Sequence, residues 1–219
     1  MFWNDVNSHQ RLQNLPDLWE KDIFDDRLVQ TLLDDLKHEQ SVLNALDRLA
    51  FLTGFGAFTH HMFLVACDDT YLDDYKNAIS VYQDATHILA TFLRRRDKLV
   101  RLSTAVIYCE MGWDWPLETT KETAKGALAQ QITDDVSELL KSTDDCRRAC
   151  MWMPSLCKRQ DLKAELISDT NLRMLVQFCD NTRIAKHEEG TSTVAFHSAQ
   201  ALSMLMKCTL TLLNLLGPS

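Results

Sequence analysis

Glycine and proline are scarce in this chain, with six glycines and four prolines among 219 residues. Almost all of them fall where the helical spacing of apolar residues also stops, and only Gly126 lies inside a helical pattern. A hairpin fold needs alternating residues between paired turns, and a parallel sheet needs strands that alternate with helices. Neither pattern occurs. The sequence therefore predicts an all-α fold.

Basic charge is also in the minority, since 31 acidic and 23 basic residues give a net charge of −8. An acidic protein has little general affinity for nucleic acid or for anionic membranes, so we expect neither as a ligand. A helical membrane span needs about 20 predominantly apolar residues. The most continuous apolar stretch, 201–216, is shorter and contains Lys207 and Asn214. We therefore expect no membrane span.

The N-terminal sequence lacks the basic and apolar regions of a signal peptide. The seven cysteines are odd in number and lie mostly within apolar helical patterns, which does not suggest a disulfide framework. We expect reduced, mostly buried thiols and an intracellular protein, cytoplasmic or nuclear.

Enzyme signatures are missing as well: there is no phosphate-binding loop, dinucleotide fingerprint, nucleophile elbow or HExxH sequence. A zinc site around Cys146 and Cys150 would require three further segments to converge, with ligands drawn from Cys157, Cys179, His187 and His197. Buried thiols are the favoured interpretation. We therefore expect neither a cofactor nor a metal ion.

The most hydrophobic stretch lies near the C-terminus, at 191–216, between a Ser/Thr cluster suited to N-capping and Gly217-Pro218. Its apolar residues recur at helical spacing on faces that we expect to be buried: Val194, Ala195, Phe196, Ala199, Leu202, Leu205, Met206, Leu210, Leu213 and Leu216. A helix that is apolar on most sides needs several neighbours. The sequence predicts a multi-helix bundle with long helices packed around this C-terminal helix.

Two parts are distinguished along the chain, a polar N-terminal arm with a short turn at 1–24 and a single helical domain at 25–219. Within the domain, apolar spacing predicts long helices at 25–53, 71–109 and 116–141. The run from Arg94 to Lys98 is an alternative kink in the second of these. Shorter helices are expected at 144–152, where Pro154 should end the helix, and at 155–167 and 170–186.

The acidic stretch 68–74 resembles the aspartate-rich DDxxxD box with which terpene and prenyl synthases bind Mg²⁺ and diphosphate, through Asp68, Asp69 and Asp73. The second motif of those enzymes is incomplete here, because Lys141 stands where the glutamate after Asp134-Asp135 is required. Six Asp-Asp pairs occur in the chain, several of them at predicted helix starts. Helix capping is therefore the favoured role of this stretch.

The densest basic cluster and an unusual pair of tryptophans supply the candidate partner-binding residues. If the cluster is helical, its charges spread over about two turns, and an acidic protein or a phosphate-bearing ligand would fit them. Two indoles in an interhelical loop either cap the core or anchor a partner. The residues concerned are Arg94, Arg95, Arg96, Lys98, Arg101, Trp113 and Trp115.

These patterns favour a non-enzymatic helical module for protein–protein interaction, an adaptor or regulator, with a protein partner that is acidic. The alternative is an all-helical Mg²⁺-dependent enzyme or carrier that acts on a phosphorylated or diphosphate ligand through 68–74. The oligomeric state has no signal in the sequence.

Overall fold

The structure is a computed structural model that describes residues 26–54, 70–82, 84–116, 122–142, 145–180, 195 and 197–206. Every regular element in these ranges is an α-helix. The predicted all-α class is therefore confirmed for the described part of the chain. The chain divides into two compact units, 1–85 and 86–219, and each is described by itself. The single-domain interpretation stays a prediction.

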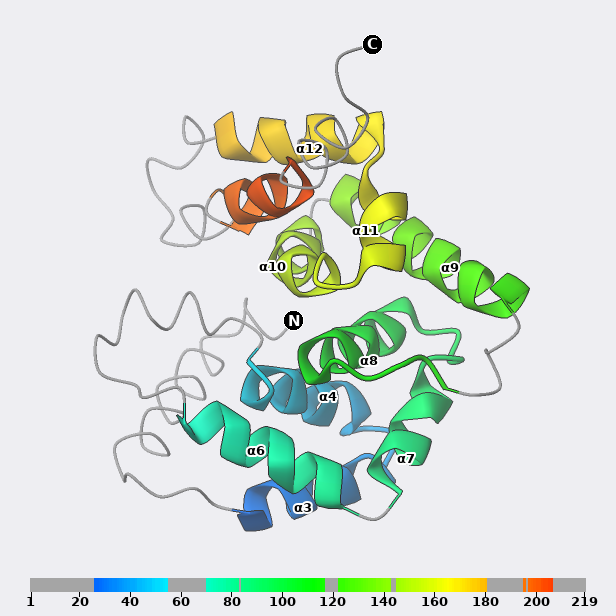
Figure 1. The fold of residues 1–219 in the computed structure, drawn as a ribbon, viewed down its shortest axis with the longest axis vertical. Coiled ribbons are helices and arrows are strands. Elements are labelled where there is room, and N and C mark those ends of the chain that lie inside the picture. The colour runs from blue at the N-terminus through cyan, green and yellow to red at the C-terminus, as the bar shows by residue number, and fades with distance from the viewer. Residues whose placement is uncertain are drawn as a thin grey trace, which may run out of the picture. The chain divides into compact units, whose positions relative to one another are not determined.

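The first unit contains three described helices, α3 (Asp26–Asp35), α4 (Val42–Leu52) and α6 (Thr70–Val81), and each packs against the other two (Figure 1). Their shared core consists of large apolar side chains that are almost fully buried, among them Leu32, Leu33, Leu46, Leu49 and Ile79. Apolar spacing of three and four residues explains this packing, because it gathers the side chains on one face of each helix.

A single helix at 25–53 was predicted, and this is wrong, because a turn separates α3 from α4. Lys37 and His38 donate their amides to carbonyls three residues earlier, at 3.0 and 3.1 Å. The Ser41 hydroxyl then bonds the carbonyl oxygens of Asp35 and His38, at 2.8 and 3.0 Å. The five consecutive residues at 37–41 are polar and provide no apolar side chain that could be buried. The predicted apolar stripe is therefore interrupted at this turn.

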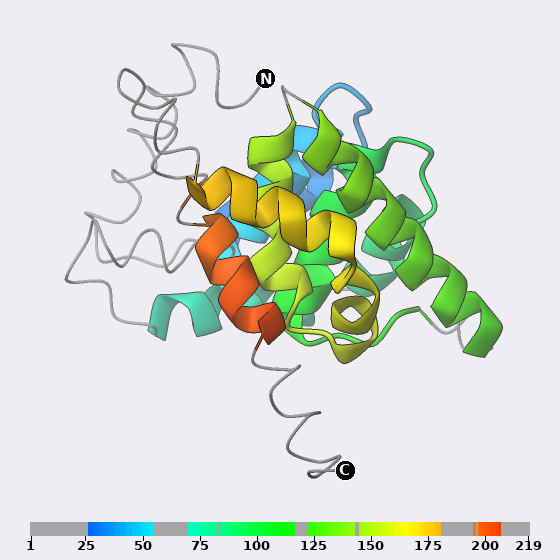
Figure 2. The same cartoon turned by 90° about the horizontal axis from the view of Figure 1, so that it is seen from above.

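In the second unit, α9 (Glu122–Lys141) has several helix neighbours among the described residues. It packs against α8 (Lys98–Met111), α10 (Cys146–Leu156), α11 (Gln160–Leu166) and α12 (Asp169–Asp180), while α10 also packs against α8 (Figures 1 and 2). Ile132, Val136 and Leu139, which the apolar spacing of 116–141 places on one helix face, are all inaccessible. The predicted end of this helix near Lys141 is confirmed.

One helix across 71–109 is also wrong, whereas the alternative kink at 94–98 is confirmed. The first break follows α6, where Asp84 has a φ of 67°, a left-handed conformation that no α-helix continues through. The short helix α7 (Ala85–Phe92) then ends before the arginines. The second break ends at Asp97, whose extended backbone and side-chain cap begin α8.

Pro154 does not end its helix as predicted, because α10 continues through it to Leu156. A proline inside a helix costs about 3 kcal/mol, since it removes one amide donor and crowds the preceding turn. Trp152, Met153 and Leu156 are all buried beside it, and burying each such side chain contributes roughly 1.5–3 kcal/mol. The tertiary packing of α10 therefore outweighs the local preference to break.

The C-terminal stretch is helical at 197–206 and lies beside α12 in both views (Figures 1 and 2). Leu205 is buried, as predicted, and Ala201 is buried too, but Met206 is 58% exposed and Ala199 is exposed as well. The buried face instead includes His197 and Ser198. The predicted apolar stripe was too wide, because residues one position apart on a helix point about 100° apart. Leu210, Leu213 and Leu216 lie outside the described residues.

No helix among the described residues is long and apolar enough to cross a membrane.

Candidate functional site

The three consecutive arginines of the basic cluster lie in the turn between α7 and α8, and all three are exposed. We call residues 93–97 the basic turn. The amide of Arg95 donates to the Phe92 carbonyl at 3.2 Å, which closes the turn after α7. Asp97 then starts α8, because its Oδ1 accepts from the amides of Leu99 at 2.9 Å and Val100 at 3.3 Å. The arginines are therefore gathered on a turn and are not spread along a helix face.

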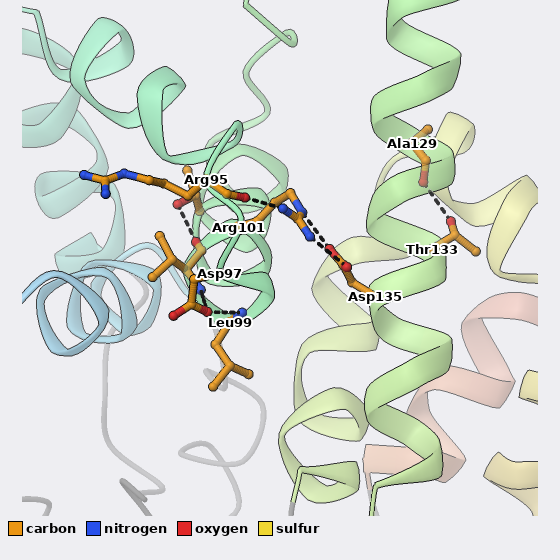
Figure 3. Close-up of polar contacts among 9 residues, drawn as sticks. Arg95, Asp97, Leu99, Arg101, Ala129, Thr133 and Asp135 are labelled. Atoms are coloured by element: carbon orange, nitrogen blue, oxygen red, sulfur yellow. Dashed lines mark hydrogen bonds and ion pairs between the residues drawn. The ribbon is translucent and has the colours of Figure 1, made fainter.

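Arg101 was predicted to belong to the same exposed cluster, but its side chain is only 5% exposed and is directed into the protein. Nε donates to Oδ2 of Asp135 at 2.6 Å, and Nη2 donates to Oδ1 at 2.8 Å. Nη1 donates to the backbone carbonyl of Arg95 (Figure 3). One guanidinium group thus connects α9 to the basic turn, and a bidentate pair of this kind is geometrically specific.

Lys98 lies one helical turn before Arg101 and pairs with a second acid on α9. Its ammonium group is 2.6 Å from Oε1 of Glu138, and both side chains are substantially exposed. The hydrogen bond from Lys98 lowers the pKa of Glu138, and the same bond raises the pKa of Lys98. An exposed pair such as this adds little to stability, and the Glu138 carboxylate offsets the positive charge of Lys98 beside the basic turn.

The two tryptophans lie after α8, in a loop that packs onto its last turns. Tyr108 stacks on Trp115 with ring centroids 5.8 Å apart and meets Trp113 edge-on at 5.5 Å. Burial raises the pKa of Tyr108 to about 12. Trp115 is itself buried, and its Nε1 donates to Asp161 Oδ2 at 2.7 Å. Trp115 therefore caps the core in this conformation, one of the two roles expected for the pair, while Trp113 remains half-buried.

Arg159 holds this loop in place through its guanidinium group, as Arg101 does for the basic turn. Its guanidinium carbon lies 4.1 Å from the centre of the Trp115 ring. Nε and Nη2 each donate to the Asp161 carboxylate at 3.0 Å, and Nη1 donates to the Trp113 carbonyl at 2.7 Å. Sequence reasoning missed Arg159, Asp161 and Asp135 as functional neighbours, because they stand far from these loops in sequence and no local motif marks them.

The acidic stretch is described only in part, since Asp68 and Asp69 lie outside the described residues. Asp73 and Asp74 are exposed in the early turns of α6. Within the described ranges, no group of three or more His, Cys, Asp or Glu side chains could hold a metal ion. The Mg²⁺-dependent alternative therefore stays a hypothesis.

The described cysteines are thiols, with Cys109, Cys150 and Cys157 buried and Cys146 and Cys179 half-buried. Burial raises the pKa of the Cys109 thiol, and it raises that of Cys150 to about 12. Neither is a thiolate at neutral pH, so neither is an activated nucleophile in this conformation. This fits the predicted packing role.

Comparison of the chain with protein-family models, with curated proteins and with solved structures found no match.

Proposed function

We propose that this chain is a non-enzymatic helical interaction module, an adaptor or regulator, and that its basic turn engages an acidic protein partner. The observation that carries the proposal is the placement of Arg94, Arg95 and Arg96 on one exposed turn whose backbone is bonded by the buried Arg101. Lys98 lies next to this turn at the start of α8, where its charge is paired with Glu138. In a chain of net charge −8, such a concentration of guanidinium groups is the feature best suited to an anionic surface.

Guanidinium groups suit this role because each presents a planar set of donors that matches a carboxylate in two parallel hydrogen bonds. Opposite charge also speeds the encounter between two proteins, more than it strengthens the final complex. A turn that is already held in place loses less conformational entropy when it binds than a loose one does. Arg101 supports the basic turn from beneath, while Trp113, which is half-buried in the loop after the other end of α8, is the next surface to test.

The predicted packing of the bundle around the C-terminal helix is part of this proposal. Its support is the burial of Ala201 and Leu205 on the described helical segment.

The test is charge reversal, with Arg95→Glu and Arg96→Glu combined in one protein. Partners are captured from the native host at low salt and quantified by mass spectrometry. We expect the acidic partner to be lost with little change in melting temperature, because exposed charges contribute little to stability. The contact of Arg95 with the Phe92 ring, at 5.5 Å, adds only about 0.5–1 kcal/mol.

A matched control carries Lys37→Glu and Arg173→Glu, which reverse two exposed charges elsewhere and change the net charge equally. Only a protein retained by this control and lost by the double reversal at the turn counts as the partner. Capture should also weaken as salt rises, since exposed charges are screened over about 10 Å at 0.1 M salt. Unchanged capture after reversal at the turn would contradict the proposal.

A further inference from the structure

We infer that Arg101 and Asp135 are positioning residues, which hold the basic turn in place and couple its order to the packing of α8 on α9. The consequence for partner binding rests on the function proposed above, whereas the coupling itself does not. Three contacts carry the inference: the two hydrogen bonds between the guanidinium and the carboxylate, and the third from Nη1 to the Arg95 carbonyl.

The geometry of the guanidinium group makes this a coupled arrangement. Its donors lie in one rigid plane, so their directions cannot be adjusted independently. Once Nε and Nη2 are bound to the two oxygens of Asp135, the direction of Nη1 is set. Nη1 is bonded to the Arg95 carbonyl. The position of that carbonyl, in the middle of the three arginines, therefore depends on where α9 holds Asp135.

The position of Asp135 is fixed by its helix, because apolar side chains of α9 before and after Asp135 are packed in the core. The neighbouring Val136 and nearby Ile132 and Leu139 are fully buried, and α9 contacts four other helices. The Arg101–Asp135 pair is itself almost entirely removed from solvent. A buried pair that loses one partner leaves an uncompensated charge, so the arrangement resists partial opening. A displacement of α9 relative to α8 would therefore release the turn.

Hydrogen exchange of the backbone amides in the basic turn tests the inference directly. The first variant replaces both members by apolar residues, Arg101→Met with Asp135→Leu, because such replacement of a buried pair usually preserves folding. The second is Arg101→Lys, which keeps the positive charge but loses the planar fork. In both, we expect exchange across 93–97, measured by mass spectrometry, to rise roughly tenfold or more, the factor that corresponds to a hydrogen bond with a charged donor.

Glu110→Gln is the matched control. Glu110 lies at the opposite end of α8, its side chain is 2% exposed, and it pairs with Lys158 at 2.5 Å. The substitution therefore removes a buried carboxylate charge from the same helix, one paired with a half-exposed lysine, without touching the turn. Exchange at 93–97 should stay at the wild-type rate in this variant, and exchange within α10 should stay unchanged in all of them.

The outcomes separate the two hypotheses. Unchanged exchange at the turn in both Arg101 variants, or an equal rise in Glu110→Gln, would overturn the positioning role. If exchange rises as expected and partner capture falls as well, both the positioning role and its functional consequence are supported. If exchange rises while capture by the folded variant is unchanged, the positioning role stands and the proposed function of the turn fails.

Discussion

At the scale of single residues, two arginines of the second unit use the guanidinium group in the same way. Arg101 and Arg159 each bind a carboxylate through Nε and Nη2, and each donates Nη1 to a backbone carbonyl in a loop beside α8. The loop before α8 is bonded by Arg101, and the loop after it by Arg159. Both ends of α8 are thus fastened by a planar donor group that a lysine could not replace.

The carboxylate of Asp161 predicts a pH dependence of stability. Burial alone would raise its pKa, but hydrogen bonds from Arg159 and Trp115, together with the Arg159 charge, lower the pKa of Asp161 below its ordinary value of 3.8. A lowered pKa in the folded state means that the contribution is present above about pH 3.8 and is lost as the pH falls through the folded-state value.

The corresponding variant is Asp161→Asn, compared with the wild type by thermal melting at several pH values. Near neutral pH we expect a loss of at most about 1 kcal/mol, because the side chain is partly exposed and solvent screens the pair. This corresponds to roughly 2–4 °C in a chain of this size. The difference between the two proteins should disappear under strongly acidic conditions. A difference that persists there would show that charge is not its cause.

At the scale of elements, helix boundaries decide where the loops lie. α8 begins at the side-chain cap of Asp97 and ends at Gly112, whose φ of 65° lies in the left-handed region. The amide of Trp113 then bonds the Tyr108 carbonyl at 3.0 Å, which completes a common glycine-based helix ending. Because α8 ends at Gly112, Trp113 and Trp115 lie in the loop that follows the helix.

Two glycine substitutions should therefore act in opposite directions. Gly126 lies inside α9, and a methyl group added there would meet no atom within 4 Å. Gly126→Ala should stabilise the protein by about 0.5–1 kcal/mol, because alanine loses less backbone entropy in a helix. Gly112→Ala should destabilise it by roughly 1–2 kcal/mol, although the space there is also open, because the left-handed backbone is strained for alanine. Urea unfolding measures both, and equal shifts would contradict this account.

Adjacent residues of the C-terminal helical segment provide a test of its packing. Leu205 is 1% exposed, whereas Met206 is 58% exposed. Leu205→Ala should cost roughly 2–5 kcal/mol, the range for a large buried side chain replaced by alanine. Met206→Ala, the matched control, should change stability by no more than about 0.5 kcal/mol. A loss below about 1 kcal/mol for Leu205→Ala would show that this segment is peripheral to the core.

At the scale of the whole molecule, the open question is how the two compact units relate in folding. The single-domain interpretation predicts one cooperative transition in calorimetry, with equal calorimetric and van't Hoff enthalpies. Leu46→Ala in the first unit and Leu205→Ala in the second should then lower the same transition, since both side chains are buried. Two transitions, each shifted by only one of the variants, would instead divide the chain into two domains.

Local sequence patterns were enough to predict the helical class and the buried face of α9, because periodicity and the scarcity of Gly and Pro act within a few turns of chain. They offered the break at 94–98 only as an alternative to one continuous helix, and the side-chain cap of Asp97 that begins α8 was not predicted. Helix lengths were overestimated where the apolar spacing was the same on both sides of a polar turn, as at 37–41.

The tertiary structure decided what the candidate residues do. Arg101 and Asp135 are 34 positions apart, and Trp115 and Asp161 are 46 positions apart. Nothing in the spacing of either pair indicates a contact, because it depends on which helices pack together. The sequence determined that three arginines would be adjacent and charged. Only the packing of α8 on α9 decided that Arg101 would be buried beneath them, since burial of that charge requires the carboxylate that α9 supplies.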